Sequence, residues 1–174
     1  MDPMETEFDY EILGEELTFV EVLANILKKC FEVSNIDCRY FPFRMHLGKT
    51  NYESTDDLLQ EFVQALGYEA REDSGISEDG DHFSLLEVDK NSNFIFTQFD
   101  EDEEEEIEEY LNKSQIAAHK KANEFMKQRF KNIYRFKIAS ESYHHACDTY
   151  PVFIFGITPQ GSALGTFTVR ADRS

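Results

Sequence analysis

Four neighbouring residues, His144, His145, Cys147 and Asp148, have side chains that bind transition metals. Imidazole and thiolate are ligands of zinc, so a metal site is one interpretation of this cluster. Two observations oppose it. Structural zinc sites use two separated ligand pairs, and adjacent residues on a strand point to opposite faces. We therefore expect a polar loop over residues 139–150, with no metal or other cofactor.

A second pattern imitates part of a calcium-binding loop. Asp89, Asn91 and Asn93 have the spacing of its first ligands, and Asp100 falls at its twelfth position. The sixth position requires glycine for a sharp turn, but this chain has Phe94 there. A hairpin turn is therefore the better interpretation of this segment.

Covalent catalysis has little support in the sequence. No G-x-S-x-G motif is present, and the only Cys-His neighbours are His145 and Cys147, which are too close along the chain to resemble a catalytic pair. We expect a protein that is not an enzyme. A metal-dependent enzyme that uses the 144–148 loop is the least favoured alternative.

The cysteines and the N-terminal sequence predict a cytoplasmic location. Cys30, Cys38 and Cys147 are odd in number and have no C-x-x-C spacing, which indicates free thiols in a reducing compartment. The first residues are acidic where a signal peptide needs bases, and no apolar run approaches the roughly 18 residues of a membrane span.

Acidity is the strongest feature of the composition. The 174 residues include 35 Asp and Glu against 17 Lys and Arg, a formal net charge of −18. Such a surface repels phosphate, so direct binding to nucleic acid or to an anionic membrane is not expected. Two blocks without Lys or Arg hold the excess: residues 1–16 carry seven acids and residues 100–109 carry nine.

The block at 100–109 has more acids than a helix terminus needs. The positive end of a helix dipole favours two or three acids, at about 0.3–1 kcal/mol each. A basic partner would relieve the repulsion among the rest, and the acids would then stand in for the phosphates of DNA. We expect partner contacts from this block, namely from Asp100, Glu101, Asp102, Glu103, Glu104, Glu105 and Glu106.

Hydrophobic periodicity predicts an α+β fold in one domain. Apolar residues at helical spacing indicate helices over 15–33, 54–66 and 100–131, the last with a break near 112–114. Alternation indicates strands over 40–47, 82–88, 93–99, 133–138, 151–157 and 162–169. We expect an antiparallel sheet of about five or six strands flanked by helices, with an acidic flexible N-terminus at 1–14 and a single domain at 15–174.

Turn residues and prolines predict where several of these strands lie in the sheet. Pro159 and Gly161 in the TPQG link predict a tight hairpin over 151–169, and apolar residues on both faces of 151–157 place it in the centre of the sheet. Pro42 has no N–H to donate, which predicts an edge position for 40–47. The segments 82–88 and 93–99, joined by DKNS, are expected to form a second hairpin.

The segments IYRF at 133–136 and PVFIFGITPQGSALGTFTV at 151–169, with YFPFRMHL at 40–47 and the acidic stretch before 111, resemble the nuclease A inhibitor family. The resemblance implies an α/β/α sandwich and a small acidic cytosolic protein that fills the active-site cleft of a sugar-non-specific endonuclease. It implies contacts from an acid ahead of the aromatic-Pro-Phe strand, here Asp37, and from the C-terminal tail, here Asp172 and Ser174. Arg173 in that tail would meet a basic cleft unfavourably.

The function expected from these observations is a non-enzymatic, acidic protein-binding module that occludes a nuclease active site. The alternative is a protein of the same fold that binds an unrelated basic partner, such as a nucleic-acid-binding protein, as an adaptor. An assay of nuclease inhibition separates the two, because function follows the site and not the fold.

Overall fold

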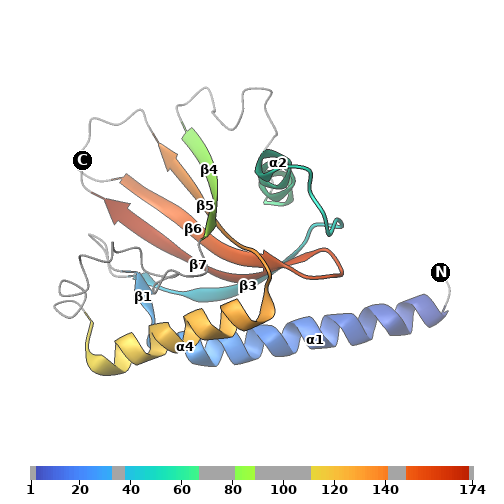
Figure 1. Ribbon diagram of the computed structural model, residues 1–174, viewed down its shortest axis with the longest axis horizontal. Coiled ribbons are helices and arrows are strands. Elements are labelled where there is room, and N and C mark those ends of the chain that lie inside the picture. Colours follow the sequence, from blue (N-terminus) through green and yellow to red (C-terminus); the bar gives the residue numbers. More distant parts are fainter. Residues whose placement is uncertain (1–2, 33–37, 67–80, 89–110, 141–147, 173–174) are drawn as a thin grey trace.

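The structure is a computed structural model that describes residues 3–32, 38–66, 81–88, 111–140 and 148–172, with side chains described for 14–32, 38–66, 111–136 and 151–170. Helices and strands alternate irregularly along the chain, which confirms the predicted α+β class (Figure 1). The elements are α1 (Pro3–Leu27), β1 (Phe31–Glu32), β2 (Cys38–Arg39), β3 (Phe41–His46), α2 (Thr55–Ala65), β4 (Asp81–Val88), α4 (Lys113–Arg129), β5 (Ile133–Ser140), β6 (Asp148–Ile157) and β7 (Ser162–Asp172).

Within the described residues, five strands form an antiparallel sheet in the order β3-β7-β6-β5-β4. The predicted hairpin is confirmed as β6 and β7. β6 is the central strand of this sheet, and β7 lies next to it. Its turn is closed by the Thr158 N–H, which donates to the Ser162 carbonyl at 2.8 Å. Gly161 adopts φ 85°, a left-handed conformation that glycine accepts without steric strain.

The predictions for the two edge strands of the described sheet can be compared with the structure to different extents. β3 is the edge strand predicted from Pro42, and among the described strands of this sheet it pairs with β7 alone. β4 confirms the strand predicted at 82–88, and it pairs with β5 along its whole length, from Asp81 opposite Ser140 to Val88 opposite Ile133. The other arm predicted for its hairpin, 93–99, lies outside the described residues.

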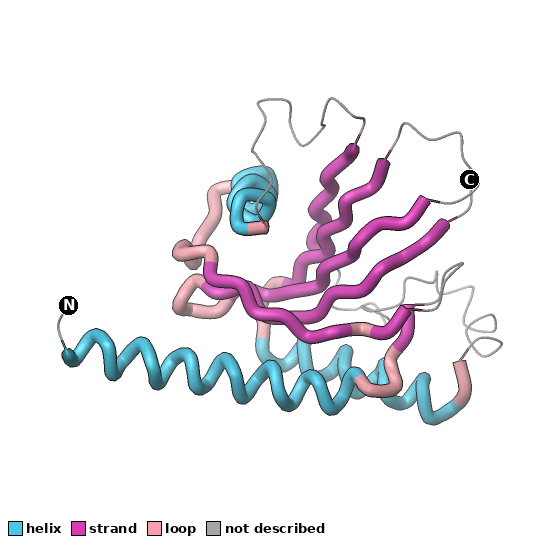
Figure 2. The backbone as a smooth tube through the Cα atoms, turned by 180° about the vertical axis from the view of Figure 1, so that it is seen from behind, coloured by secondary structure: helices cyan, strands magenta, loops and turns pink. Residues whose placement is uncertain are grey.

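The first helix begins and ends earlier than predicted. α1 starts at Pro3, not at residue 15, and it ends at Leu27, not at residue 33. Proline is favoured at the first helical position, and glutamate is a good helix former that suits the positive end of the dipole, so the acidic lead-in continues the helix. Figure 2 shows this first part of α1 extending past the sheet.

The other two helices follow local capping signals. The Ser54 side chain accepts from the Asp57 N–H and caps α2, at the start of the predicted helix 54–66. Asn112 and Gln115 form a capping box at the start of α4, at the predicted break. The acidic half of the predicted helix, 100–110, lies outside the described residues. Among the described helices, none has the length and apolarity needed to cross a membrane.

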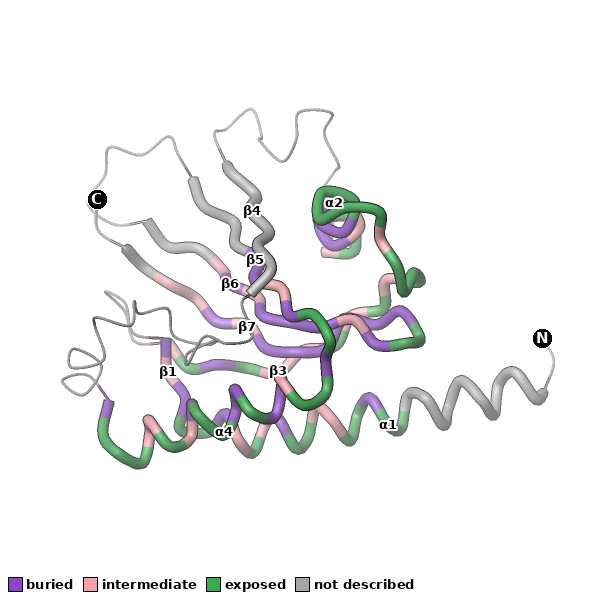
Figure 3. Tube along the Cα trace, viewed as in Figure 1, coloured by how far each residue is buried: buried purple, intermediate pink, exposed green. Residues whose placement is uncertain are grey.

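The helices cover both faces of the sheet (Figure 1). α1 and α4 lie side by side on one face, where Leu23, Phe125 and Met126 pack with Val152 and Ile154. α2 lies on the other, where a cluster forms around Phe62, Phe136, Phe153 and Phe155. Figure 3 shows burial concentrated where β6 and β7 pass between the helices.

Phe155 tests this placement. Its side chain is fully buried, and its ring stacks on Phe62 with centroids 4.5 Å apart. We predict that Phe155→Ala lowers the free energy of unfolding by about 3–5 kcal/mol, measured by urea denaturation, because a cavity remains. Phe41, which is 46% exposed, is the matched control. A loss at Phe155→Ala no larger than at Phe41→Ala would show that the two-sided core is wrong.

Candidate functional site

Most residues predicted to bind a partner lie outside the described part of the chain. The described backbone includes one of them, Asp172, the last residue of β7, opposite Asp148, the first residue of β6. The predicted residues that lie outside are Asp37, Asp100, Glu101, Asp102, Glu103, Glu104, Glu105, Glu106 and Ser174.

The metal-like cluster is described only in part. His144, His145 and Cys147 lie outside the described residues, whereas Asp148 opens β6. Within the described residues, no group of three or more His, Cys, Asp or Glu side chains could hold a metal ion. Cys30 and Cys38 are free thiols, as predicted. Burial raises the pKa of Cys30 to about 12, so its thiol stays protonated at neutral pH.

The segment that carries Asp37 is fixed at both of its ends. Glu32 precedes residues 33–37 and Cys38 follows them, and the two pair as the ends of the short strands β1 and β2. Two residues cannot hold a ladder alone, so other contacts must fix this pair. Thr168 of β7 supplies one set: its hydroxyl donates to the Arg39 carbonyl at 3.0 Å and to the Cys38 carbonyl at 3.4 Å.

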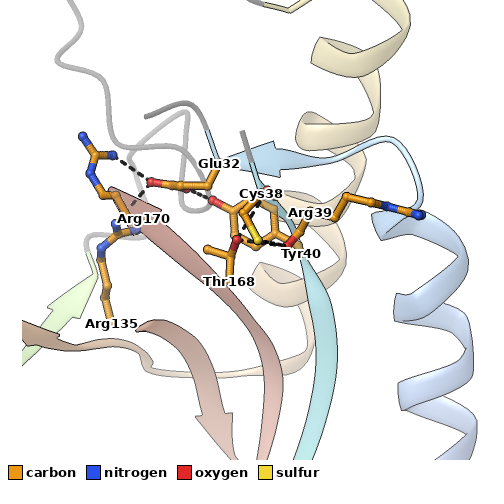
Figure 4. Close-up of polar contacts among 7 residues, drawn as sticks. All are labelled: Glu32, Cys38, Arg39, Tyr40, Arg135, Thr168 and Arg170. Carbon is orange, nitrogen blue, oxygen red and sulfur yellow. Dashed lines mark hydrogen bonds and ion pairs between the residues drawn. The ribbon is translucent and has the colours of Figure 1, made fainter. Parts of the chain in front are cut away.

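Glu32 supplies the other set through its carboxylate, which is fully buried. Its Oε1 accepts from Arg170 Nη1 at 2.8 Å and lies 3.6 Å from Arg135 Nη2. Its Oε2 accepts from the Tyr40 hydroxyl. Figure 4 shows the three donors converging on the carboxylate from β5, β7 and the residue before β3. We call these four residues the Glu32 cluster.

Electrostatics make the Glu32 cluster interdependent. Burial raises the pKa of the Glu32 carboxyl, and the guanidinium groups of Arg135 and Arg170 oppose that rise. Arg135 is itself 5% exposed, so its charge also needs the carboxylate. Removing one partner from such a buried set leaves an uncompensated charge, which costs about 3–5 kcal/mol.

A buried histidine joins the same region from α4. His119 is 1% exposed, and its Nε2 accepts from the Phe31 N–H at 3.1 Å. Its ring meets the Tyr40 ring edge-on, with centroids 6.1 Å apart. Burial lowers the pKa of His119 to about 4, so the imidazole is neutral and can accept this hydrogen bond. α4 thereby holds β1 from its helix side.

The sequence interpretation missed Glu32, Tyr40, Arg135, Arg170 and His119. Glu32 fell inside the predicted helix 15–33, because Phe31 continued its apolar stripe. Arg135 alternates with Tyr134 and Phe136 in the predicted strand 133–138, and its own pattern gives no sign of burial. One signal pointed the other way: the neighbouring strand 151–157 is apolar on both faces, so a charge on either face of its partner strand is expected to be buried.

These contacts fix to the sheet the two strand ends that flank residues 33–37. The Glu32 carboxylate and the Arg135 guanidinium are buried and paired, Arg170 is partly exposed, and the buried His119 imidazole accepts from the Phe31 N–H. No protein-family model matches the chain, and no curated protein matches it. The resemblance to nuclease A inhibitors therefore stays a prediction that depends on the segments 40–47, 133–136 and 151–169 and on the acidic stretch before 111.

His119 predicts a specific dependence of stability on pH. Its folded-state pKa of about 4 lies below the 6.5 of an ordinary histidine, so the unfolded state binds more protons between these values. The stability contribution is complete above pH 6.5 and is lost as the pH falls towards 4. We predict that the free energy of unfolding falls between pH 7 and pH 5 by about 2 kcal/mol more in the unchanged protein than in the His119→Gln variant. Urea denaturation at the two pH values measures both. Equal losses in the two proteins would contradict a buried neutral imidazole.

Proposed function

We propose that the chain is a non-enzymatic inhibitor that binds a basic protein and occludes its active site, with a sugar-non-specific endonuclease as the partner. The proposal includes the finer fold of the family that it resembles, an α/β/α sandwich, and a cytoplasmic location. Helices on both faces of one antiparallel sheet support the fold. The net charge of −18 supports a basic partner.

The observation that carries the proposal is the buried pairing of Glu32 with Arg170. Glu32 is the residue before the 33–37 segment, which includes Asp37, and Arg170 is two residues before Asp172. The resemblance assigns partner contacts to both of these segments. One ion pair therefore joins the residues at which the two segments proposed to contact the nuclease begin.

Such an anchor favours tight binding for an entropic reason. A loop that is ordered only on binding costs about 0.5–1.5 kcal/mol for each immobilised side chain. Strands fixed to β7 by Glu32, Tyr40 and Thr168 reduce that cost at the ends of the 33–37 segment. We propose that the acidic block at 100–106 has a different role, which is to steer the encounter with the partner.

The C-terminal tail and the acidic block are expected to affect different steps of binding. Deleting Asp172, Arg173 and Ser174 should mainly speed dissociation, because it removes direct contacts. Changing Glu103, Glu104, Glu105 and Glu106 to Gln should mainly slow association and reduce its dependence on salt, because charges at the rim act at a distance. The measurement is surface-plasmon kinetics with an immobilised endonuclease of this class, alongside its digestion of DNA with and without the protein.

A charge-matched variant serves as the control. Changing Glu5, Glu7, Glu11 and Glu21 to Gln removes the same number of charges from α1. If this variant slows association as much as the 103–106 variant, net charge and not the block is responsible. If the intact chain at micromolar concentration leaves DNA digestion unchanged, the inhibitor proposal is wrong and the unrelated basic partner takes its place.

A further inference from the structure

A cleft of about 270 Å³ lies between α1, the end of α4 and the turn that joins β6 to β7. Glu15, Glu16 and Phe19 line it from α1, Phe130 from the end of α4, and Pro159 and Gln160 from the turn. We call it the Glu16 cleft. It lies at the opposite end of β7 from the Glu32 cluster: Leu164, which also lines it, is six residues from Arg170, or about 20 Å along the strand.

Glu16 has an oxygen that the described protein does not satisfy. The side chain is 4% exposed, and its Oε2 pairs with Arg44. Its Oε1 is buried and accepts no hydrogen bond from the described residues. A buried polar atom that lacks a partner costs about 1–3 kcal/mol, and more when it is charged. Glu16 lines the cleft, so a donor that enters the cleft is a candidate partner for this atom.

The walls of the cleft fit a long cationic side chain. The rings of Phe19 and Phe130 meet edge-on, with centroids 5.6 Å apart, and provide an apolar surface for a methylene stem. The C-terminal end of the α4 dipole and the exposed Glu15 carboxylate add negative potential. Arg129 also lines the cleft, but its guanidinium is engaged with the Phe125 ring, 3.8 Å from the centroid, and with the Phe125 carbonyl.

We propose that the Glu16 cleft binds a lysine or arginine side chain from a basic segment of a partner protein. The cation would donate to Glu16 Oε1 and pair with Glu15, and its stem would lie on Phe19 and Phe130. The inference goes beyond the proposed inhibition, because it uses the other end of the central hairpin and requires no nuclease. The chain would then have two separate surfaces for basic partners.

The test is an NMR titration of the full ¹⁵N-labelled chain with acetyl-tetralysine amide. We expect amide shifts in residues 15–19 and 157–164, and no such shifts with the fully ε-acetylated peptide. Glu15→Gln should raise the dissociation constant about threefold to fivefold, as expected for an exposed ion pair, and Glu16→Gln should raise it more, because Glu16 is buried. Glu21→Gln, an exposed change in the same helix away from the cleft, should change it less than twofold.

Glu15→Gln decides the outcome, because Glu15 is exposed and its loss leaves the pair of Glu16 with Arg44 intact. If Glu15→Gln and Glu21→Gln weaken binding equally, the peptide senses only net charge and the proposal is wrong. Shifts confined to residues outside the cleft would also overturn it. Neither result bears on nuclease inhibition, which is measured separately.

Discussion

Glu32 has a carboxyl group with no access to water, and three polar groups of the surrounding structure converge on it. Arg170 and Arg135 bring two guanidinium groups from β7 and β5, and Tyr40 brings a hydroxyl from the residue before β3. Each of these groups would be costly to bury without the carboxylate. The short strands β1 and β2 therefore remain on the sheet. Separating them from it would leave buried charged groups without their partners.

The two faces of the sheet differ in composition: one is an aromatic core, and the other also contains the two proposed binding regions. On the α2 face, Phe62 packs against Phe136, Phe153 and Phe155 in an aromatic cluster. On the α1 and α4 face, the apolar core around Met126 and Ile154 gives way at one end to the Glu32 cluster and at the other to the Glu16 cleft. Both proposed binding surfaces thus begin where apolar packing ends, and the aromatic face can hold the sheet rigid beneath them.

Local signals in the sequence predicted the central part of the fold. The TPQG turn, the alternation over 151–169 and Pro42 placed β6, β7 and β3, and Ser54 placed the start of α2. These features depend on residues close together in the chain. The Glu32 cluster does not, because Glu32 and Arg170 are 138 residues apart and only the folded sheet brings them together. The same limit explains the helix end: the apolar stripe of α1 continues to Phe31, whereas tertiary contacts place that residue in β1.

The most direct test of this account is a double-mutant cycle between Glu32 and Arg170, measured by urea denaturation. Glu32→Gln and Arg170→Met remove the charges and keep much of each side chain's volume. The account predicts that each single change is destabilising and that the double variant is more stable than their sum implies, with a coupling of about 1.5–3 kcal/mol. Additive effects, with a coupling below about 0.5 kcal/mol, would contradict the claim that this buried pair holds the proposed binding segment on the sheet.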